Sequence, residues 1–573
     1  MKRMILYFFC PVMLIIACNT EKKETKQVAA YTIEQLQNNL SLNGLGFNND
    51  ETKILVDHNG SGIYNVYELN IADTSFKPLT ASTKESFYAV AYIPGTSNFI
   101  YRADQGGNEN YHLYLRAIGD TISKDLTPWP KSANSFAGWT ADKKSFYISS
   151  NKRDPKYFDL WKMDTSKWKE SLFYKNDSGY DVGSISKSER YLALTKASTT
   201  NKNDLYIFDR KTNKLKRISN DNEANWNAQA FEKNDSVLYY TTNDSSEFAY
   251  LVKYNVQTGA AQKLYSVNWD VADMTLSENE RYYTITINED GKNKVLLFDH
   301  VSGKQLDFPV FADGDVESVT ISPSEKNMLL TVGSSRTPHN LFVYNFEKKE
   351  LKQLTQTLNK AISPDDLVTA QIVRFKSFDG MDIPAIYYKT LQASSSNKVP
   401  AIVWVHGGPG GQSRAGFSNQ IQFLVNHGYA VLAVNNRGSS GYGKTFFKLD
   451  DKKHAEGDLM DCVYGKKWLA SQDYIDSSKI AIEGGSYGGC MVLTALAFHP
   501  DEFKAGVELF GVANWLRTLR SIPPYWESFR KALYEEMGDP NGPDSVMLKH
   551  TSPLYNYEKI NKPLIVFQGS NDV

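Results

Sequence analysis

The residues Ala481 to Cys490, written AIEGGSYGGC, place a serine between glycines at the junction of two predicted elements. The preceding run SSKIAIE predicts a short buried strand, and the following run CMVLTALAFHP is rich in helix formers up to Pro500. Gly484-x-Ser486-x-Gly488 therefore lies at a strand-to-helix turn, the context in which this pattern indicates a nucleophilic serine. The glycines permit a strained turn that exposes the Ser486 hydroxyl at the helix N-terminus. A glycine-rich structural turn is the alternative, and the five residues alone favour it.

Two further loops contain groups that could complete the chemistry around Ser486. The first, His406-Gly-Gly-Pro-Gly410, follows the predicted strand AIVWV, and its glycines leave backbone amides open toward a reacting carbonyl group. We predict that the N–H groups of Gly408 and Tyr487 form an oxyanion hole. His406 is predicted to stabilise its loop, because the usual task of such a loop is to donate backbone hydrogen bonds.

The second loop contains Asp572, the candidate carboxylate. It follows the predicted strand PLIVFQ and comes after Ser486 in the chain, where an α/β-hydrolase has the residue that orients its catalytic histidine. An aspartate after a Gly-Ser-Asn turn can equally cap a helix, so its position alone leaves both roles open. Together with the other two loops, the position favours a catalytic role.

These loops belong to residues 366–573, in which apolar strands alternate with helical stretches. The runs PAIVWVHGG, YAVLAVNNRG, KIAIEGGS, AGVELFG and PLIVFQGSND are rich in Val, Ile and Leu and contain glycine-rich turns. Such runs are typical of parallel strands that are buried on both faces. We therefore predict an α/β-hydrolase domain with a doubly wound, mostly parallel sheet, and its chemistry in loops at the carboxyl ends of the strands.

Residues 45–365 repeat a different unit. A strand, a polar turn and a second strand recur every 45 to 47 residues, and a further hairpin follows each pair. The repeats begin near Phe47, Tyr92, Trp139, Ile185, Phe231, Leu276 and Ile321. Four strands per unit cannot bury their faces without neighbours, so we predict that seven units close into an all-β seven-bladed propeller. An open β-solenoid is the alternative, but its repeat is usually shorter.

The N-terminus predicts export and lipidation. Lys2 and Arg3 precede an apolar run that is too short to span a bilayer and that ends in Leu-Ile-Ile-Ala-Cys18. Residues 1–18 resemble a bacterial lipoprotein signal, which is cleaved before a cysteine that carries the lipid. The alternative is an ordinary secretory signal in which Cys18 is incidental. Residues 19–44 are predicted to form a polar tether and N-terminal segment. We expect a protein of the bacterial cell envelope, anchored to a membrane through Cys18 and facing the periplasm or the outside.

Charge and cysteine content exclude other classes. The 573 residues have a net charge of −1 without a basic or acidic block, so nothing indicates nucleic acid as a partner. We expect no cofactor and no metal ion. Apart from Cys10 and Cys18, only Cys462 and Cys490 remain, which are too few for a disulfide framework and leave a single bond between them open.

The order of these features resembles one family. A propeller is followed by HGGPGG, by NNRGSSGYGKTF (residues 435–446), by GGSYGG and by GSND, as in the prolyl oligopeptidase family of serine peptidases. The chain is most similar to the branch of acylaminoacyl-peptidases and dipeptidyl-peptidase-like enzymes, which the segments DQGGNENYHLY and YWESFRKALYEEMGDP also resemble. The resemblance implies hydrolysis of short peptides, with a propeller that excludes folded proteins. Ser486 would attack the scissile carbonyl, and Asp572 would orient a histidine.

That histidine is missing from the 573 residues. The resemblance places it a few tens of residues after Asp572, yet all nine histidines precede Asp572. His454, His499 and His550 are predicted to be surface or capping residues. Without a base, Ser486 keeps the weak nucleophilicity of an ordinary hydroxyl, so we expect the chain as given to be nearly inactive.

Two interpretations of this gap belong to different classes of protein. Either the sequence is that of a C-terminally incomplete peptidase domain, or the protein is a non-catalytic, lipid-anchored propeller that binds peptides or partners. We favour the first, because the chain stops immediately beyond a predicted strand, before the last strand and helix that would cover the sheet. A carboxylesterase is a further alternative, since the same triad cleaves esters.

Two features concern the substrate. The propeller contains no evident Glu-Glu insertion of the kind that anchors a free substrate amine in dipeptidyl peptidases, which favours acyl-peptide or endo-type cleavage. Tyr525 and Trp526 are candidates to line an apolar specificity pocket, but buried packing is the role that we expect for them.

Overall fold

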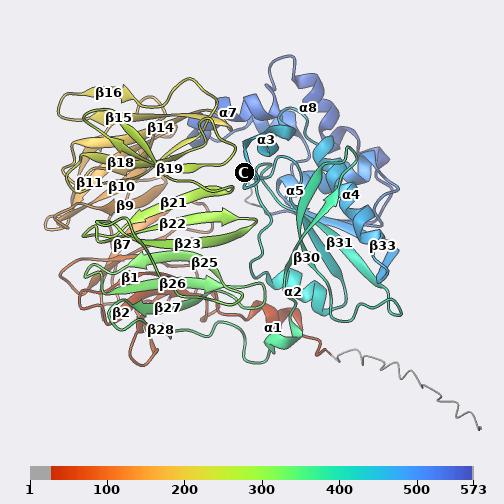
Figure 1. Cartoon of the computed structure of the whole chain (residues 1–573), viewed down its shortest axis with the longest axis horizontal. Helices are drawn as coiled ribbons and strands as arrows, with labels where there is room; N and C mark the ends of the chain where they lie inside the picture. Colours follow the sequence, from red (N-terminus) through yellow and green to blue (C-terminus); the bar gives the residue numbers. More distant parts are fainter. Residues whose placement is uncertain (1–27, 571–573) are drawn as a thin grey trace, which may run out of the picture.

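The computed structural model describes residues 28–570, which form a β-propeller and an α/β domain that lie side by side (Figure 1). The predicted sites Cys18 and Asp572 lie outside the described residues. Within residues 28–570, no helix is both long enough and apolar enough to cross a membrane.

Each blade of the propeller is a four-stranded sheet made of four consecutive strands. Blades 1 to 3 contain β1 (Leu42–Phe47), β2 (Lys53–His58), β3 (Asn65–Asn70), β4 (Phe76–Pro78); β5 (Tyr88–Tyr92), β6 (Asn98–Ala103), β7 (His112–Ala117), β8 (Lys124–Asp125); and β9 (Asn134–Trp139), β10 (Ser145–Asp154), β11 (Tyr157–Asp164), β12 (Lys169–Tyr174). Blades 4 and 5 contain β13 (Asp181–Ile185), β14 (Tyr191–Thr199), β15 (Lys202–Asp209), β16 (Lys214–Arg217); and β17 (Trp226–Phe231), β18 (Val237–Thr242), β19 (Tyr250–Asn255), β20 (Ala261–Tyr265). Blades 6 and 7 contain β21 (Asp270–Leu276), β22 (Tyr282–Glu289), β23 (Lys292–Asp299), β24 (Gln305–Leu306); and β25 (Asp315–Ile321), β26 (Asn327–Gly333), β27 (Asn340–Asn345), β28 (Glu350–Gln353).

The residues that mark the sequence repeat end the first strand of each blade, as Phe47 ends β1 and Ile321 ends β25. A tight polar turn follows each of them, and the apolar side chains of one blade pack against the next. In blades 5 and 6, for example, Tyr239 and Leu251 share a buried cluster with Ile285. Seven such units confirm the predicted propeller and exclude the solenoid.

The ring closes through side chains, because β1–β4 and β25–β28 form separate sheets without a shared strand. The Glu51 carboxylate of blade 1 accepts hydrogen bonds from the Ser324 backbone N–H and hydroxyl of blade 7, both at 2.7 Å, and from the Asn327 amide at 3.2 Å. Lys352 of blade 7 donates to the carbonyl oxygen of Ile71 at 2.7 Å. These polar contacts connect the first and last blades, which have no strand in common.

The α/β domain is built on a seven-stranded sheet of order β29-β30-β32-β31-β33-β34-β35. Its strands are β29 (Gln371–Lys376), β30 (Asp382–Tyr388), β31 (Val399–Val405), β32 (Ala430–Val434), β33 (Ile475–Gly485), β34 (Gly506–Leu509) and β35 (Leu564–Phe567). The pairs β29/β30 and β30/β32 are antiparallel, and all pairs from β32 to β35 are parallel. The predicted α/β-hydrolase sheet is therefore confirmed.

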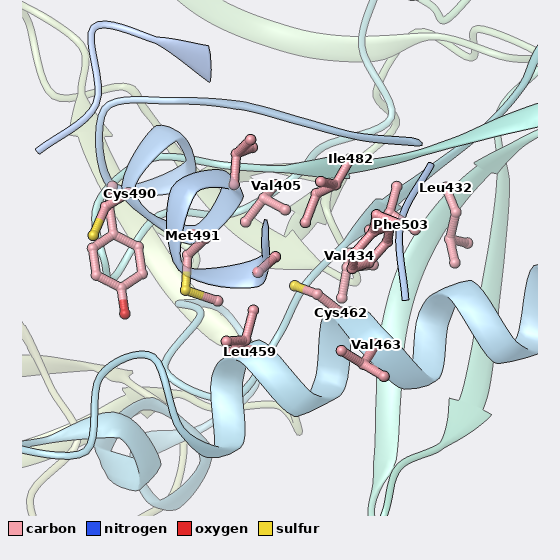
Figure 2. Packing of buried hydrophobic residues seen from close by; sticks show 14 of the residues in the cluster. Val405, Leu432, Val434, Leu459, Cys462, Val463, Ile482, Cys490, Met491 and Phe503 are labelled. Atoms are coloured by element: carbon pink, nitrogen blue, oxygen red, sulfur yellow. The ribbon is translucent and has the colours of Figure 1, made fainter. Parts of the chain in front are cut away.

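Helices cover both faces of this sheet. The α-helices are α1 (Ile33–Gln37), α2 (Asn419–Asn426), α3 (Lys444–Phe447), α4 (Gly457–Ala470), α5 (Tyr487–Phe498), α6 (Trp515–Arg520), α7 (Glu527–Met537) and α8 (Ser545–Thr551). Short 3-10 helices are η1 (Pro364–Asp366), η2 (Lys448–Asp450), η3 (Pro524–Trp526), η4 (Pro553–Tyr555) and η5 (Tyr557–Lys559). On one face, Leu459 of α4 and Met491 of α5 pack with Val405 and Ile482 of the strands (Figure 2). On the other face, Ile421 of α2 packs in a second buried cluster.

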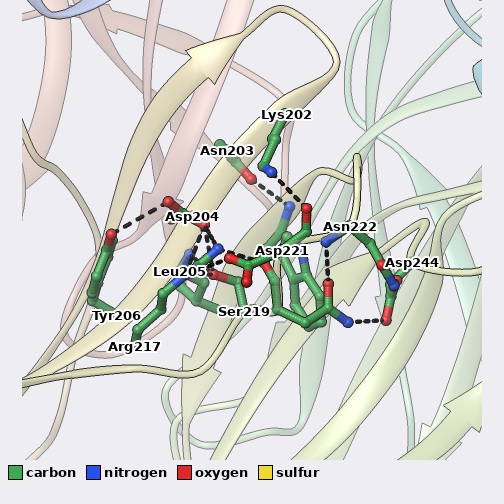
Figure 3. Close-up of polar contacts among 12 residues, drawn as sticks. Lys202, Asn203, Asp204, Leu205, Tyr206, Arg217, Ser219, Asp221, Asn222 and Asp244 are labelled. Carbon is green, nitrogen blue, oxygen red and sulfur yellow. Dashed lines mark hydrogen bonds and ion pairs between the residues drawn. The ribbon is translucent and has the colours of Figure 1, made fainter.

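Loops of the propeller bind the α/β domain through polar contacts. The Glu247 carboxylate accepts hydrogen bonds from the Thr445 N–H at 2.9 Å and hydroxyl at 2.7 Å, and Lys448 pairs with Glu223 at 2.6 Å. The loop that contains Glu223 is held by a polar network in which Arg217 pairs with Asp204 at 2.6 Å (Figure 3). This network thus connects the edge of blade 4 with the domain interface.

The structure answers two questions that the sequence raised. Cys462 and Cys490 are both free and buried, so no disulfide joins them. Tyr525 and Trp526 are 37% and 47% exposed, so the expectation that they are buried is wrong. They lie in η3, a short turn before α7 that is outside the core of the sheet.

Candidate active site

Ser486 lies at the sharp turn between β33 and α5. Its backbone adopts φ 55° and ψ −120°, a sparsely populated conformation for a residue with a side chain, which costs of order 1–3 kcal/mol. The Ser486 N–H donates to the carbonyl oxygen of Leu509 at 2.9 Å, so the end of β34 holds the turn in place. The predicted strand-turn-helix context of Ser486 is therefore present.

The two glycines of the Gly-x-Ser-x-Gly pattern allow strand and helix to approach closely. A Cβ atom at Gly484 would lie 2.6 Å from the carbonyl carbon of Gly488, and a Cβ atom at Gly488 would lie 2.2 Å from the carbonyl oxygen of Val405. Neither position can accept a side chain unless the backbone moves. The glycines thus set the distance between α5 and the sheet, and with it the position of Ser486.

The glycine-rich loop after β31 lies beside Ser486. A Cβ atom at Gly407 would lie 3.3 Å from Cβ of Ser486, so only a glycine fits comfortably here. Gly408 adopts φ 140°, which also favours glycine. Tyr487 is the first residue of α5, where backbone N–H groups have no partner within the helix. The assignment of Gly408 and Tyr487 as oxyanion donors stays a prediction.

His406 is bound within its own loop. Its Nε2 atom lies 2.7 Å from the Ser439 hydroxyl, and its Nδ1 atom lies 2.8 Å from the carbonyl oxygen of Gly407. Burial lowers its pKa, so the ring is neutral at pH 7. These contacts confirm the expectation that His406 supports the loop.

β35 is the strand that precedes the predicted carboxylate, Asp572, in the sequence. β35 pairs with β34 in parallel, and β34 pairs with β33, so all three strands end at the edge of the sheet where Ser486 lies. Phe510, which follows β34, donates its backbone N–H to the carbonyl oxygen of Phe567 at 2.7 Å. Asp572 itself lies beyond the last described residue.

All nine histidines lie within residues 28–570, and in that range none is hydrogen-bonded to Ser486. His499 caps the end of α5, and the His550 ring is exposed and stacks on Phe498, in line with the predicted capping and surface roles. His454 was expected at the surface, which is wrong. It is 5% exposed and lies under the N-terminus of α5, because the turn after η2 folds back beneath that helix.

The side chain of Tyr487 ends in a buried cluster that the sequence analysis missed. Its hydroxyl donates a short hydrogen bond to the Asp458 carboxylate and lies 3.0 Å from Nδ1 of His454. Burial, then the charges of Asp458 and Glu536, raise the pKa of Asp450 to about 9. Burial lowers the pKa of His454 to about 4. The only signal in the sequence is the spacing of four residues between Asp450, His454 and Asp458.

The segment Asn435 to Phe446 is held by a buried ion pair. The Arg437 guanidinium donates from Nε and from its second terminal nitrogen to the Asp461 carboxylate, both at 2.9 Å, and it pairs with Asp379 at 3.1 Å. Asp461 is fully buried and also accepts a hydrogen bond from the Ser377 hydroxyl at 2.6 Å. The pair thus fixes the loop that follows β32.

A cavity of about 380 Å³ lies between the propeller and the α/β domain. Asn201, Asn227, Thr241 and Asp270 contribute to it from the propeller. Gly410, from the glycine-rich loop beside Ser486, contributes to its opposite wall together with residues 440–447. The space next to this loop therefore lies between the two domains and has both polar and apolar walls.

A seven-bladed propeller joined to an α/β-hydrolase sheet with a serine at the strand-to-helix turn defines a class of two-domain serine hydrolases. Two family models match the chain accordingly: the N-terminal β-propeller domain of prolyl oligopeptidase over residues 78–357 and the prolyl oligopeptidase family over residues 415–573. The chain belongs to the prolyl oligopeptidase family.

The chain is similar in sequence to several peptidases. Dipeptidyl aminopeptidase BIII of Pseudoxanthomonas mexicana is 29% identical over 519 residues, which are 85% of this chain and 72% of that protein. Prolyl endopeptidase of Elizabethkingia meningoseptica is 24% identical over 66% of this chain and 55% of its own length. The chain thus spans between about half and three quarters of these relatives.

Solved structures share the fold. A puromycin-hydrolyzing peptidase of Mycobacterium tuberculosis superposes with a TM-score of 0.78 at 14% identity, covering 95% of this chain and 88% of that one. Prolyl oligopeptidase B of Galerina marginata superposes with a TM-score of 0.77 at 18% identity, covering 93% and 81%. At these identities the likeness concerns the architecture.

Proposed function

We propose that this protein is a serine peptidase that hydrolyses short peptides through an acyl-enzyme. The observation that carries the proposal is the strained turn of Ser486 with the Gly407 loop against it. A serine held in this way can attack a carbonyl group while backbone N–H groups stabilise the oxyanion. The cavity beside Gly410 lies between the α/β domain and the propeller, which would limit access to short, flexible chains.

We propose further that the general base is a histidine supplied from beyond the 573 residues. The contacts of the nine histidines support this, since within the described range none reaches Ser486. The side chains of β35 support it too, because Ile565, Val566 and Phe567 are each more than half exposed. Apolar side chains on an edge strand call for a further strand or helix to cover them.

The test is the full-length protein encoded by the gene, read past the codon for Val573. We expect it to hydrolyse an aminoacyl arylamide and to react with a serine-directed phosphonate at Ser486. Ser486→Ala should lower turnover by several orders of magnitude, as removal of one triad member does in other serine hydrolases. If Ser486→Ala keeps a tenth of the activity, Ser486 is not the nucleophile.

Substrate choice separates the remaining functions. A carboxylesterase would cleave a simple aryl ester faster than the arylamide, and a binding protein would retain peptides without cleaving them. We propose cleavage of acyl-peptides or internal bonds, so a blocked N-terminus on the peptide should leave turnover intact. Loss of activity on blocked peptides, with activity kept on free ones, would instead assign a dipeptidyl peptidase.

We propose a lipid anchor at Cys18. The lipoprotein signal in residues 1–18 supports it. The mature protein should sediment with membranes and carry a diacylated N-terminal cysteine by mass spectrometry, and Cys18→Ala should release it into the soluble fraction. An unmodified mature N-terminus would contradict the proposal.

A further inference from the structure

A buried cluster beneath the N-terminus of α5 has the composition of a metal site. Asp450 ends η2, His454 lies in the following turn, and Asp458 lies in the first turn of α4. One ligand atom from each of the three lies within 4.8 Å of the other two. Nδ1 of His454 is 3.6 Å from Oδ2 of Asp450, which is close to the separation of about 3.3 Å that a tetrahedral ion with bonds of 2.0–2.1 Å requires.

The cluster has an atom without a partner. Oδ2 of Asp450 has no hydrogen bond with any described residue, although the side chain is 2% exposed. This is the atom that faces His454. An orphaned carboxylate oxygen at such depth is costly, because a buried polar group normally finds a partner.

The cluster also lacks compensating charge. Asp450 and Asp458 are both buried, and Glu536, 7% exposed, is near enough to raise the pKa of Asp450. Within the part of the chain that the structure describes, no lysine or arginine forms an ion pair with Asp450 or Asp458. Buried carboxylates are usually paired or bind a metal, so a cation is the group that this environment lacks.

Asp458 is oriented for such a role. Its Oδ1 atom accepts backbone N–H groups from Glu456 at 2.9 Å and Leu459 at 2.8 Å. Its Oδ2 atom accepts the Ala455 N–H at 3.3 Å and, on the side of the cluster, a short hydrogen bond from the Tyr487 hydroxyl. Outer hydrogen bonds that fix a carboxylate in this way are typical of metal ligands.

We propose that Asp450, His454 and Asp458 bind one divalent transition-metal ion, with the Tyr487 hydroxyl beside the fourth position. One imidazole and two carboxylates suit Zn²⁺, whereas Mg²⁺ and Ca²⁺ prefer all-oxygen sites with more ligands. The site is separate from the chemistry proposed for Ser486. Through Tyr487, the ion would hold the first residue of α5 in place.

Metal content of the intact, untagged protein tests the proposal. After treatment with a chelator and then ZnCl₂, gel filtration and mass spectrometry should find about one Zn²⁺ per chain, and CoCl₂ should give the visible absorption of a tetrahedral ion. Asp450→Asn and His454→Gln should each weaken Zn²⁺ binding at least about tenfold. Asp451→Asn is the matched control, because this neighbouring carboxylate bonds Asn201 instead and should leave binding unchanged.

Two results would overturn the proposal. One is a wild-type protein that keeps less than about a fifth of an equivalent of Zn²⁺, in which case a proton on Asp450 is the only occupant. The other is Zn²⁺ binding that Asp450→Asn and His454→Gln leave unchanged, which would place the metal elsewhere. Thermal unfolding adds a check that does not depend on the variants, since ZnCl₂ should raise the melting temperature of the wild type over that in chelator.

Discussion

Glu483 in β33 offers a direct test of how the core of the α/β domain responds to pH. Its side chain is 3% exposed, and its carboxylate accepts a short hydrogen bond from the Gln420 amide. Burial raises its pKa from 4.5 to about 7. The folded state therefore holds the proton more tightly than the unfolded state. The stability that this proton contributes is complete below about pH 4.5 and is lost as the pH rises through about 7.

A pKa raised from 4.5 to about 7 corresponds to about 3 kcal/mol over the whole pH range, and to slightly less between pH 5 and pH 8. Glu483→Gln keeps an acceptor for Gln420 but cannot ionise. We therefore expect the wild type to lose about 2–3 kcal/mol more than Glu483→Gln between pH 5 and pH 8 in urea unfolding followed by tryptophan fluorescence. Glu558→Gln, at an exposed side chain, is the matched control and should follow the wild type. Wild-type and Glu483→Gln curves that stay parallel within about 0.5 kcal/mol would refute the reasoning.

Two further substitutions probe the supports of the site. Arg437→Met leaves the fully buried Asp461 without its cation, so we expect the free energy of unfolding in urea to fall by about 3–5 kcal/mol. The double variant Arg437→Met/Asp461→Asn should recover most of this loss. An Arg437→Met protein as stable as the wild type would contradict the prediction. Gly488→Ala should cost about 1–3 kcal/mol and should abolish phosphonate labelling of the full-length protein, because the new methyl group would meet the backbone oxygen of Val405. Gly46→Ala, where the methyl group meets nothing within 4 Å, is its control. Normal labelling of Gly488→Ala would show that α5 can shift without loss of the site.

The repeat was readable from the sequence because each blade is a local structure. The strands of a blade are consecutive, so their alternation and turns appear in one stretch of about 46 residues, as from Phe47 to Tyr92. The contacts between the two domains could not be predicted from the sequence. Glu247 and Thr445 are 198 residues apart, and nothing in their neighbourhoods indicates that they meet. Long-range polar contacts of this kind follow from the assembled surfaces rather than from local pattern.

The candidate site likewise has features that could be predicted from the sequence and features that could not. The turn at Ser486 and the conformation of Gly408 could be predicted because glycine patterns indicate the local backbone, and both residues have positive φ values. The burial of His454 could not be found, because it depends on a turn that packs under a helix more than thirty residues later. The expectation that Tyr525 and Trp526 are buried was wrong for a related reason. Aromatic side chains are typical of a hydrophobic core, but η3 lies outside the core that packs around the sheet.

The strain at Ser486 and the buried cluster beneath it act on the same short piece of backbone. The conformation of Ser486 is unfavourable by itself and persists only where its neighbours are fixed. On one side, Leu509 holds its N–H; on the other, Tyr487 begins α5 with a side chain bound to Asp458 and His454. Any group that binds Asp450 and His454 therefore stabilises the turn from below, without touching a substrate. The same contacts would hold the Tyr487 N–H where an oxyanion needs it, since a donor acts best when it need not reorganise.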